Sequence, residues 1–443
     1  MNGKAFLIGI LTALLLYGCS EQTKISPQEM AYRWSDMALY VTQFTPANSP
    51  TYASRGVGYI GLTMYESIVH GFDSHTSLAG QLNDLSGVPR PEANAEYVWE
   101  LSFNAASAEI LRSIYNQTSD ENKLKIDSLE EATLRMFRSG HASDIVERSR
   151  AYGRSVAQAI FEWSKTDGGH RGYLRNFDKD FEHPAQPGHW QPPLYAQAIS
   201  HNPLHPYWGD NRTFLAINKG LELPYMIPYD TTEGSDYYNQ FLAVYEKDLT
   251  LTRDEKEQAI WWGDDPDVTF TPPGHSFYLA TSAMKLVEPD FIQIAETYAR
   301  VGLAVADAFI NCWKWKYHFF SERPNTFIPQ FIDREWVSFW PDPPFPAFPS
   351  GHAIQASAMA TVMIDLYGQD LVFADSAHYG RERDELRDTD FVVQDFDEFW
   401  DIATETADSR FYGGIHTPQD NDVGLEEGRR IATHVNQLIW RKE

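Results

Sequence analysis

The 443-residue sequence is poor in cysteine and in basic residues, and each shortage excludes a class of function. Its two cysteines, Cys19 and Cys312, cannot supply a disulfide framework or a cysteine-based zinc site. Its 36 Lys and Arg are outnumbered by 62 Asp and Glu, and the formal net charge of -26 argues against a surface for nucleic acid or anionic membranes. Any basic site must therefore be a local exception in an acidic chain.

Long apolar runs are also missing after the first twenty residues. The run from Ala5 to Leu16 follows Lys4 and is too short for a comfortable membrane span, which predicts a secretory signal. The position of Cys19 just behind it resembles the lipobox of bacterial lipoproteins, and an ordinary signal peptide is the alternative. We predict a signal peptide at 1–18, a tether at 19–27, and an exported bacterial lipoprotein anchored through Cys19 that is periplasmic or at the cell surface.

The remaining chain is rich in hydrophobic (43%) and aromatic (14%) residues, which is enough to bury a substantial core. Apolar residues recur at helical spacing, so we predict an all-α fold, a helical bundle in one domain over 28–443 with halves 28–250 and 251–443. Residues 166–228, rich in Pro, Gly, Trp and Tyr, predict a long irregular insertion. The expected helices are 28–45, 51–72, 92–116, 122–138, 143–165, 234–247, 253–262, 276–286, 290–317, 353–368, 394–409 and 422–440.

Two short motifs in the C-terminal half could contribute to an anion site. In the first, Lys316 is followed after six residues by Arg323-Pro324, although such charges alone usually only solubilise a loop. The second is the stretch 349–352, Pro-Ser-Gly-His, at the start of a predicted helix. The first backbone N–H groups of a helix lack partners and attract anions, while a plain N-cap with an incidental histidine is the alternative.

The third motif runs from Ser409 and Arg410 to His416, with Asp420 four residues farther on. A guanidinium suits bidentate contact with a tetrahedral oxyanion, and a histidine oriented by a carboxylate can act as a ligand or a nucleophile. Each motif alone is ambiguous. Together they supply one Lys, two Arg, a hydroxyl, a helix N-terminus and two His, which is what a phosphate-like anion requires.

The ordered set Lys-x6-Arg-Pro, Pro-Ser-Gly-His and Ser-Arg-x5-His resembles the motifs of type 2 phosphatidic acid phosphatases, class A acid phosphatases and vanadium-dependent haloperoxidases. All ten motif positions match. The resemblance implies an all-α core in which neighbouring helices surround the anion. It implies that His416 binds vanadium or attacks phosphorus, that His352 is the acid–base residue and that Asp420 orients His416. The oxygens of vanadate or phosphate would be held by Lys316, Arg323, Ser350, Gly351 and Arg410.

Positions around the motifs resemble the haloperoxidase branch. Trp313 and Phe345 match aromatic positions that line the halide pocket of chloroperoxidase-like members, although core packing is the commoner role of such side chains. Bromoperoxidases carry a histidine at the position of Phe345, which disfavours bromide preference of that kind and leaves chloride and iodide open. The roughly 300 residues before Lys316 exceed what class A acid phosphatases have.

The resemblance therefore implies a vanadate-dependent haloperoxidase that oxidises a halide with hydrogen peroxide to a hypohalous species, which then reacts with small organic acceptors. Lys316 would polarise the peroxide and His352 would accept its proton. A phosphomonoesterase that forms a phosphohistidine at His416 is the alternative, and a lipid-anchored binding protein is a third possibility. The preferred halide, the oligomeric state and the membrane face stay open.

Other polar residues have weaker patterns. His189 and His275 lie in Pro/Gly-flanked aromatic stretches, and their spacing does not supply the convergent ligands of a transition-metal site. We therefore expect wall or packing roles for them. The acidic stretch 264–267 could place a carboxylate behind Arg410 or Arg323, but a surface acidic loop is the simpler interpretation.

Overall fold

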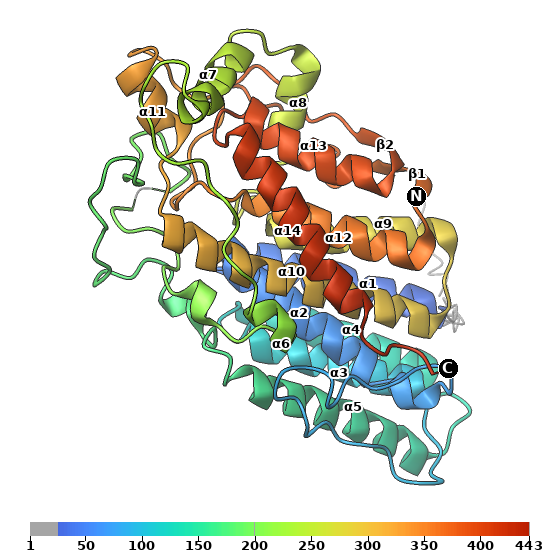
Figure 1. Cartoon of the computed structure of the whole chain (residues 1–443). Helices are drawn as coiled ribbons and strands as arrows, with labels where there is room; N and C mark the ends of the chain where they lie inside the picture. The colour runs from blue at the N-terminus through green and yellow to red at the C-terminus, as the bar shows by residue number, and fades with distance from the viewer. Residues whose placement is uncertain (1–24, 199, 443) are drawn as a thin grey trace, which may run out of the picture.

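A computed structural model describes residues 25–198 and 200–442, and structural statements below refer to these residues. The signal peptide predicted at 1–18 lies outside the described residues, as does all but 25–27 of the predicted tether. Helices dominate the described chain, as predicted (Figure 1). They are α1 Pro27–Gln43, α2 Pro50–Glu66, α3 Trp99–Ile114, α4 Asp120–Phe137, α5 Ser143–Ser164, α6 Ala216–Lys219, α7 Asp236–Asp248, α8 Arg253–Trp261, α9 Thr271–Val287, α10 Phe291–Phe319, α11 Pro324–Phe331, α12 Gly351–Tyr367, α13 Phe399–Tyr412 and α14 Pro418–Asn436.

Local sequence explains where several helices begin. Ser26 and Ser49 cap α1 and α2, and in each case a proline occupies the first turn, where no backbone N–H is needed. Asp290 and Thr417 begin α10 and α14 with reciprocal capping boxes. The same rule explains the start of α9. This helix begins at Thr271, five residues before the predicted start, and its prolines lie in the first turn, where they are tolerated.

The prediction of a helix over 394–409 is wrong for its first five residues. Residues Gln394–Glu398 form strand β2, which pairs antiparallel with β1, Asp370–Asp375, so that Phe373 lies opposite Phe396. Phe396 is buried between more exposed neighbours, and this alternation has the period of a strand. The short helix α11 was not predicted, and the helix predicted over 51–72 ends at Glu66 and is followed by a 3₁₀ turn at Val69–Gly71.

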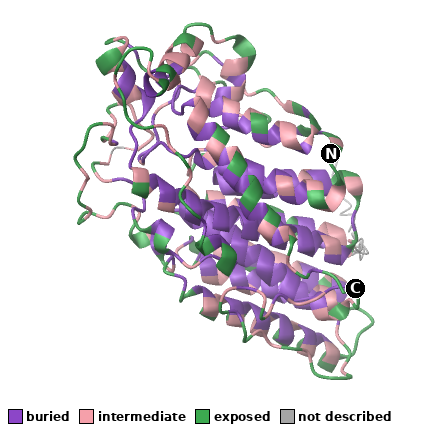
Figure 2. Cartoon of the chain, in the orientation of Figure 1, coloured by how far each residue is buried: buried purple, intermediate pink, exposed green. Residues whose placement is uncertain are grey.

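Helix α10 runs through the middle of the bundle and is buried along nearly its whole length (Figure 2). It packs against α2 on one side and against α12 and α14 on another (Figure 1). Its approach to α2 depends on small residues, because a Cβ on Gly61 would lie 2.2 Å from the carbonyl oxygen of Tyr298. The two sequence halves therefore share one continuous core.

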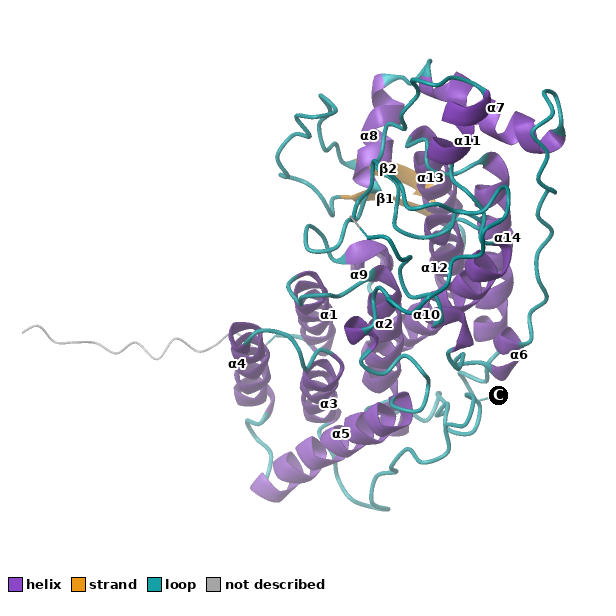
Figure 3. Cartoon of the chain, turned by 90° about the vertical axis from the view of Figure 1, so that its left-hand side faces the viewer, coloured by secondary structure: helices purple, strands orange, loops and turns teal. Residues whose placement is uncertain are grey.

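The predicted irregular insertion at 166–228 is confirmed. Its described residues, which leave out 199, form no helices other than the 3₁₀ turns Gly172–Leu174 and Trp208–Asp210 and the four-residue α6. Its loops gather at one end of the bundle, which Figure 3 faces. The buried carboxylate of Asp307 on α10 holds the insertion in place by accepting hydrogen bonds from the N–H groups of Phe214 (2.6 Å) and Leu215 (3.1 Å). Among the described residues, no helix has both the length and the apolar character that crossing a membrane requires.

Candidate active site

The three motifs meet at helix ends on the side of the bundle that carries the long loops. Lys316 lies in the last turn of α10, Arg323 caps α11, Ser350 caps α12 and Arg410 lies in the last turn of α13. His416 follows in the turn before α14. All five are at most 2% exposed. Residues separated by about a hundred positions in the sequence thus converge in the interior.

Hydrogen bonds to the proline-rich loop before α12 hold the first motif. The Lys316 ammonium donates to the carbonyl oxygens of Pro346 (2.9 Å) and Ala347 (2.5 Å). The Arg323 guanidinium donates to the carbonyl oxygens of Phe345 (3.0 Å) and Ile415 (2.8 Å). Because Ile415 precedes His416, the first motif is tied directly to the third.

The second and third motifs each leave a buried nitrogen without a partner. Arg410 donates through Nη2 to the carbonyl oxygen of Ala259 (2.8 Å), but its Nη1 is buried and has no hydrogen-bond partner in the described chain. The same holds for Nε2 of His352. A buried polar atom without a partner costs about 1–3 kcal/mol, so both atoms point to a ligand that would satisfy them.

His416 is hydrogen-bonded to Asp420, the residue that the resemblance implies would orient it. Its Nδ1 lies 3.0 Å from Oδ2 of Asp420, and that oxygen also accepts the N–H of Thr417 at 3.1 Å. Burial, followed by the nearby Arg323 and Lys316, holds the pKa of His416 well below its usual range. The ring is therefore neutral at pH 7, donates through Nδ1 and keeps a lone pair on Nε2, as a metal ligand requires.

The site carries buried positive charge that the protein does not pair. Burial lowers the pKa of Lys316 to about 7 and that of Arg410 to about 10. Within the described residues, neither these two side chains nor Arg323 has a carboxylate within ion-pair distance. Cations that are buried without anionic partners destabilise the free protein and favour a bound anion.

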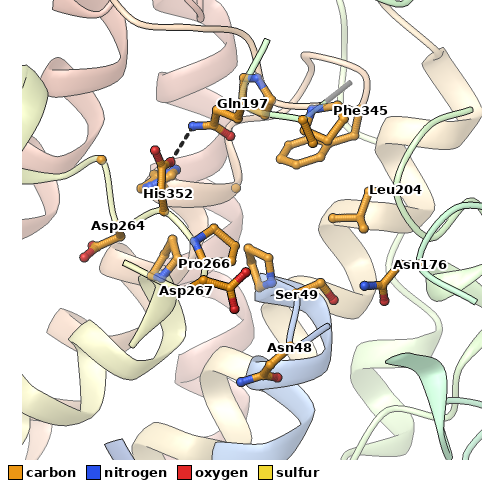
Figure 4. A pocket seen from close by; sticks show the side chains of 18 of the residues that line it. Asn48, Ser49, Asn176, Gln197, Leu204, Asp264, Pro266, Asp267, Phe345 and His352 are labelled. Carbon is orange, nitrogen blue, oxygen red and sulfur yellow. Dashed lines mark hydrogen bonds between the residues drawn. The ribbon is translucent and has the colours of Figure 1, made fainter. Parts of the chain in front are cut away.

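A cavity of about 380 Å³ is lined by both histidines, His352 and His416, and by Gly351. Trp313 and Phe345 form part of its wall, with ring centroids 5.0 Å apart. Figure 4 shows Phe345 at the cavity, and the halide pocket stays a prediction. A Cβ on Gly351 would meet nothing closer than 3.7 Å, a contact with Trp313. The space beside the Gly351 backbone is thus open to a ligand.

These features fit a tetrahedral oxyanion such as vanadate. The N-terminus of α12, the Ser350 hydroxyl and three cationic side chains supply donors, and His416 supplies a lone pair. The structure brings together every residue of the three predicted motifs. Their individual roles remain predictions.

The acidic stretch 264–267 differs from the expected surface loop. Asp264 is 1% exposed and accepts from Nδ1 of His275 at 2.8 Å, whereas Asp267 is exposed. His275 lies in the first turn of α9 and not in a loop, and its Nε2 donates to Asp375 at 2.8 Å. Burial opposes the charge on this imidazole, but Asp264 and Asp375 prevail and raise the pKa of His275 to about 10.

The expectation that no potential ligands converge around His275 is therefore wrong. Atoms of Asp264, His275 and His378 lie within 4.8 Å of one another, because strand β1 brings His378 beside α9. Each of these three side chains is already hydrogen-bonded within the cluster, so the network is complete without an ion. His189 stays outside it, and its Nδ1 lies 3.0 Å from the carbonyl oxygen of Pro184.

Sequence reasoning missed several polar residues of the cavity wall. Asn48 and Ser49 come from the turn between α1 and α2, and Gln197 comes from the long insertion, where its amide donates to Asp265 at 2.8 Å (Figure 4). Such residues are common in turns and loops. Nothing in their local pattern signals a position beside His352.

Comparisons with known proteins agree with this geometry. Residues 330–441 match the family model described as the VCPO second helical-bundle domain. The chain is also similar to the structure described as the first bacterial vanadium-dependent iodoperoxidase, with 29% identity, a TM-score of 0.79 and coverage of 93% of this chain and 97% of that one. On the strength of these matches, the chain is a vanadium-dependent haloperoxidase. It is therefore an oxidoreductase, and its homologues depend on vanadium.

Two further haloperoxidase structures share the fold at lower identity. The apo form of a bacterial vanadium-dependent chloroperoxidase is 15% identical, with a TM-score of 0.68 and coverage of 89% of this chain and 94% of that one. The holo form of a bacterial chloroperoxidase is also 15% identical, with a TM-score of 0.65 and coverage of 94% and 93%. No curated protein matches this haloperoxidase.

Proposed function

We propose that this haloperoxidase uses vanadate held at His416 to oxidise iodide with hydrogen peroxide. The observation that carries the proposal is the pair of buried nitrogens without a partner, Nη1 of Arg410 and Nε2 of His352, together with the ring of His416, whose Nδ1 is held by Asp420. Similarity to an iodoperoxidase over nearly the whole chain supports iodide as the halide. Phe345 stands where the resemblance gives bromoperoxidases a histidine, so it disfavours bromide preference of that kind and leaves chloride and iodide open.

Vanadate would be held from several sides by this chain. His416 would bind the metal through Nε2, while Lys316, Arg323 and Arg410 would contact its oxygens together with the Ser350 hydroxyl and the Gly351 N–H. Bound vanadium(V) supplies a Lewis acid that does not need to change its oxidation state. Because the cations are fixed by carbonyl groups and by packing, they stabilise developing negative charge without reorganising.

His352 is the residue suited to proton transfer. Burial, followed by Arg410, keeps the pKa of His352 well below its usual range, so the imidazole is neutral and its unpartnered Nε2 can accept a proton from hydrogen peroxide. The Lys316 ammonium then offsets charge on the peroxide oxygen. Overall, hydrogen peroxide, iodide and one proton give hypoiodous acid and water, with two electrons passing from iodide to peroxide.

The test is iodide oxidation by purified protein that has been stripped of metal. We expect triiodide to form from iodide and hydrogen peroxide only after orthovanadate is added. Hydrolysis of p-nitrophenyl phosphate is measured in parallel. Phosphate ester hydrolysis that vanadate inhibits, with no halide oxidised, would instead identify the phosphomonoesterase of the same superfamily.

We also propose that the haloperoxidase is exported and held to a membrane by a lipid on Cys19. The support is the short apolar run after Lys4 and the position of Cys19 directly behind it. An enzyme that releases hypohalous acid outside the cytoplasm would spare cytoplasmic thiols from oxidation.

A further inference from the structure

A second, much smaller cavity lies between the long insertion and the centre of the bundle. Its wall includes Arg55 on α2, Ile310 on α10, and Trp208 and Asn211 from the insertion. It shares no lining residue with the cavity at the two histidines. Its volume is about 10 Å³, on the measure by which a single water molecule needs roughly 10–15 Å³. The cavity therefore has room for one small guest.

Three N–H donors in the wall of the second cavity have no hydrogen-bond partner within the described chain. They are Nη1 of Arg55, Nε1 of Trp208 and Nδ2 of Asn211. All three side chains are at most 6% exposed. Arg55 and Asn211 lie beside each other, since a Cβ on Gly169 would be 2.9 Å from Cδ of the first and 3.0 Å from Nδ2 of the second. Buried donors without partners are rare, so this group indicates a guest that accepts hydrogen bonds.

Positive charge exceeds negative charge at this cavity. The Arg55 guanidinium pairs through Nε with Asp167 at 2.6 Å and donates through Nη2 to the carbonyl oxygen of Ser164. Arg212 also lines the cavity, but it donates to the Thr166 hydroxyl and to a backbone carbonyl, and no carboxylate of the described chain lies within ion-pair distance of it. Two guanidinium groups thus face one carboxylate. A monovalent anion would neutralise the remaining charge.

The number of donors and the size of the cavity together favour a monatomic anion. A cation is excluded by the donors, and a water molecule accepts only two hydrogen bonds, which would leave one of the three N–H groups without a partner. Phosphate or sulfate needs more space than the cavity offers. A halide ion accepts hydrogen bonds from any direction, and chloride is only slightly larger than water, whereas iodide is much larger.

We propose that the second cavity binds one chloride ion, held by Arg55, Trp208 and Asn211, and that this ion fastens the insertion to α2. The chloride does not react there, so the inference is independent of the proposed function. Leu204 of the same insertion lines the cavity at the two histidines. Chloride would therefore also stabilise part of the wall of the reaction site. Since the ion binds only to the folded protein, it stabilises that state by mass action.

The experiment measures thermal unfolding of the full-length enzyme in rising concentrations of chloride. Saturating orthovanadate is present throughout, so that the predicted anion site at His416 is occupied, and sodium gluconate keeps the ionic strength constant. We expect the midpoint of unfolding to rise by a few degrees along a saturable curve that gives the dissociation constant for chloride. Iodide at the same concentrations should produce a smaller rise, because it is too large for the cavity.

Two variants make the same chemical change at different buried indoles. Trp208→Phe removes one donor and keeps an aromatic ring, so the dissociation constant for chloride should rise by about tenfold or more. Trp190→Phe is the control, because the Trp190 indole is also buried in the insertion and its N–H also lacks a partner among the described residues, but it does not line the second cavity. It should keep the parent value, and both variants should bind vanadate as the parent does.

Long-wavelength anomalous diffraction from crystals grown with chloride identifies the guest directly. A chlorine signal in contact with the nitrogens of Arg55, Trp208 and Asn211 is the expected result. Electron density there without an anomalous signal would identify a water molecule and overturn the inference. Equal chloride dependence of Trp208→Phe and the parent would overturn it as well. These readouts do not use turnover, so they test the chloride site separately from the haloperoxidase reaction.

Discussion

At the scale of single residues, the two histidines of the cavity are prepared for different tasks. His416 has one ring nitrogen committed to Asp420, which leaves the other free to bind a metal. His352 has no such partner for its buried Nε2. The difference follows from position, since His416 directly precedes the cap of α14 while His352 lies in the first turn of α12.

We expect His416→Ala to abolish vanadate binding and iodide oxidation together. His352→Ala should retain vanadate but lose about 10²–10⁴-fold in turnover, the usual contribution of a general acid or base. Vanadate binding by calorimetry and triiodide formation at saturating vanadate separate the two effects. Full turnover by either variant would disprove the role assigned to that histidine.

Gly351→Ala tests whether the backbone beside α12 faces the anion. The added methyl group would make only ordinary contacts with Trp313 and Cys312, at 3.7 and 4.0 Å. We therefore expect the midpoint of thermal unfolding to stay close to that of the parent, while the dissociation constant for vanadate rises by about tenfold or more as one donor is shielded. An unchanged dissociation constant would place the anion elsewhere.

At the scale of elements, the site depends on how closely helices can approach. A Cβ on Gly428 of α14 would lie 2.1 Å from the carbonyl oxygen of Ile354 on α12. These two helices carry or directly follow the cavity histidines. Close packing through small residues thus sets the distance between His352 and His416.

Gly428→Ala should separate α12 from α14. We expect the free energy of unfolding to fall by about 1–3 kcal/mol, the usual result of overpacking, despite the better helix propensity of alanine. Urea unfolding measures the loss, and vanadate affinity should fall in parallel. Gly87→Ala, where an added Cβ would meet nothing within 4 Å, is the control and should change neither quantity.

The buried imidazole of His275 joins three elements through Asp264, which follows α8, and Asp375 on β1. Its folded-state pKa of about 10 lies above the unfolded value, so the charged form is stabilised by folding. The resulting stability is complete below pH ~6.5 and disappears as the pH rises through about 10, at about 1.4 kcal/mol per pH unit.

The contribution of the charged imidazole to stability can be measured by comparing the free energies of unfolding of the parent and of His275→Gln. The parent should be more stable than the variant at pH 6, and the difference in the free energy of unfolding should shrink steadily toward pH 10. Urea unfolding at several pH values, with equal m-values for both proteins, provides the measurement. A difference that does not depend on pH would mean that the imidazole is neutral in the folded protein.

At the scale of the whole molecule, an acidic chain encloses a site that contains three buried cationic side chains. The net charge is -26, yet the cations of the site are almost fully buried at one end of the bundle. Helix α2 of the N-terminal half packs against α10, and residues of the same half line much of the cavity. The C-terminal half carries the three predicted anion-site motifs. The predicted domain limits remain a prediction, but a cavity built by both halves explains why the site needs nearly the whole chain.

Membrane attachment is the prediction that belongs to this scale. We expect the protein to sediment with membranes and to incorporate a labelled fatty acid, and Cys19→Ser to lose both properties while keeping haloperoxidase activity. Cys312→Ser is the control, because Cys312 is fully buried on α10 and should not accept a lipid. Label that persists in Cys19→Ser would place the lipid at another residue, and absence of label in the parent protein would exclude the lipid.

The sequence by itself determined most of the helices, because helical periodicity and capping are local properties that α1, α10 and α14 display within their own residues. It also predicted the residues of the candidate anion site, because Lys316, Ser350 and His416 stand in compact motifs of fixed spacing. A strand such as β2 was misassigned, since five residues are too few for a reliable period and its partner lies some twenty positions away.

Only the tertiary structure decided what surrounds those motifs. The burial of Asp264, the convergence of His275 with His378, and the use of Asn48 and Gln197 as cavity wall all depend on contacts between residues far apart in the chain. Such contacts are selected by packing of whole elements and leave no periodic trace in the local sequence. For the same reason, the volume and the lining of the cavity belong to the folded molecule alone.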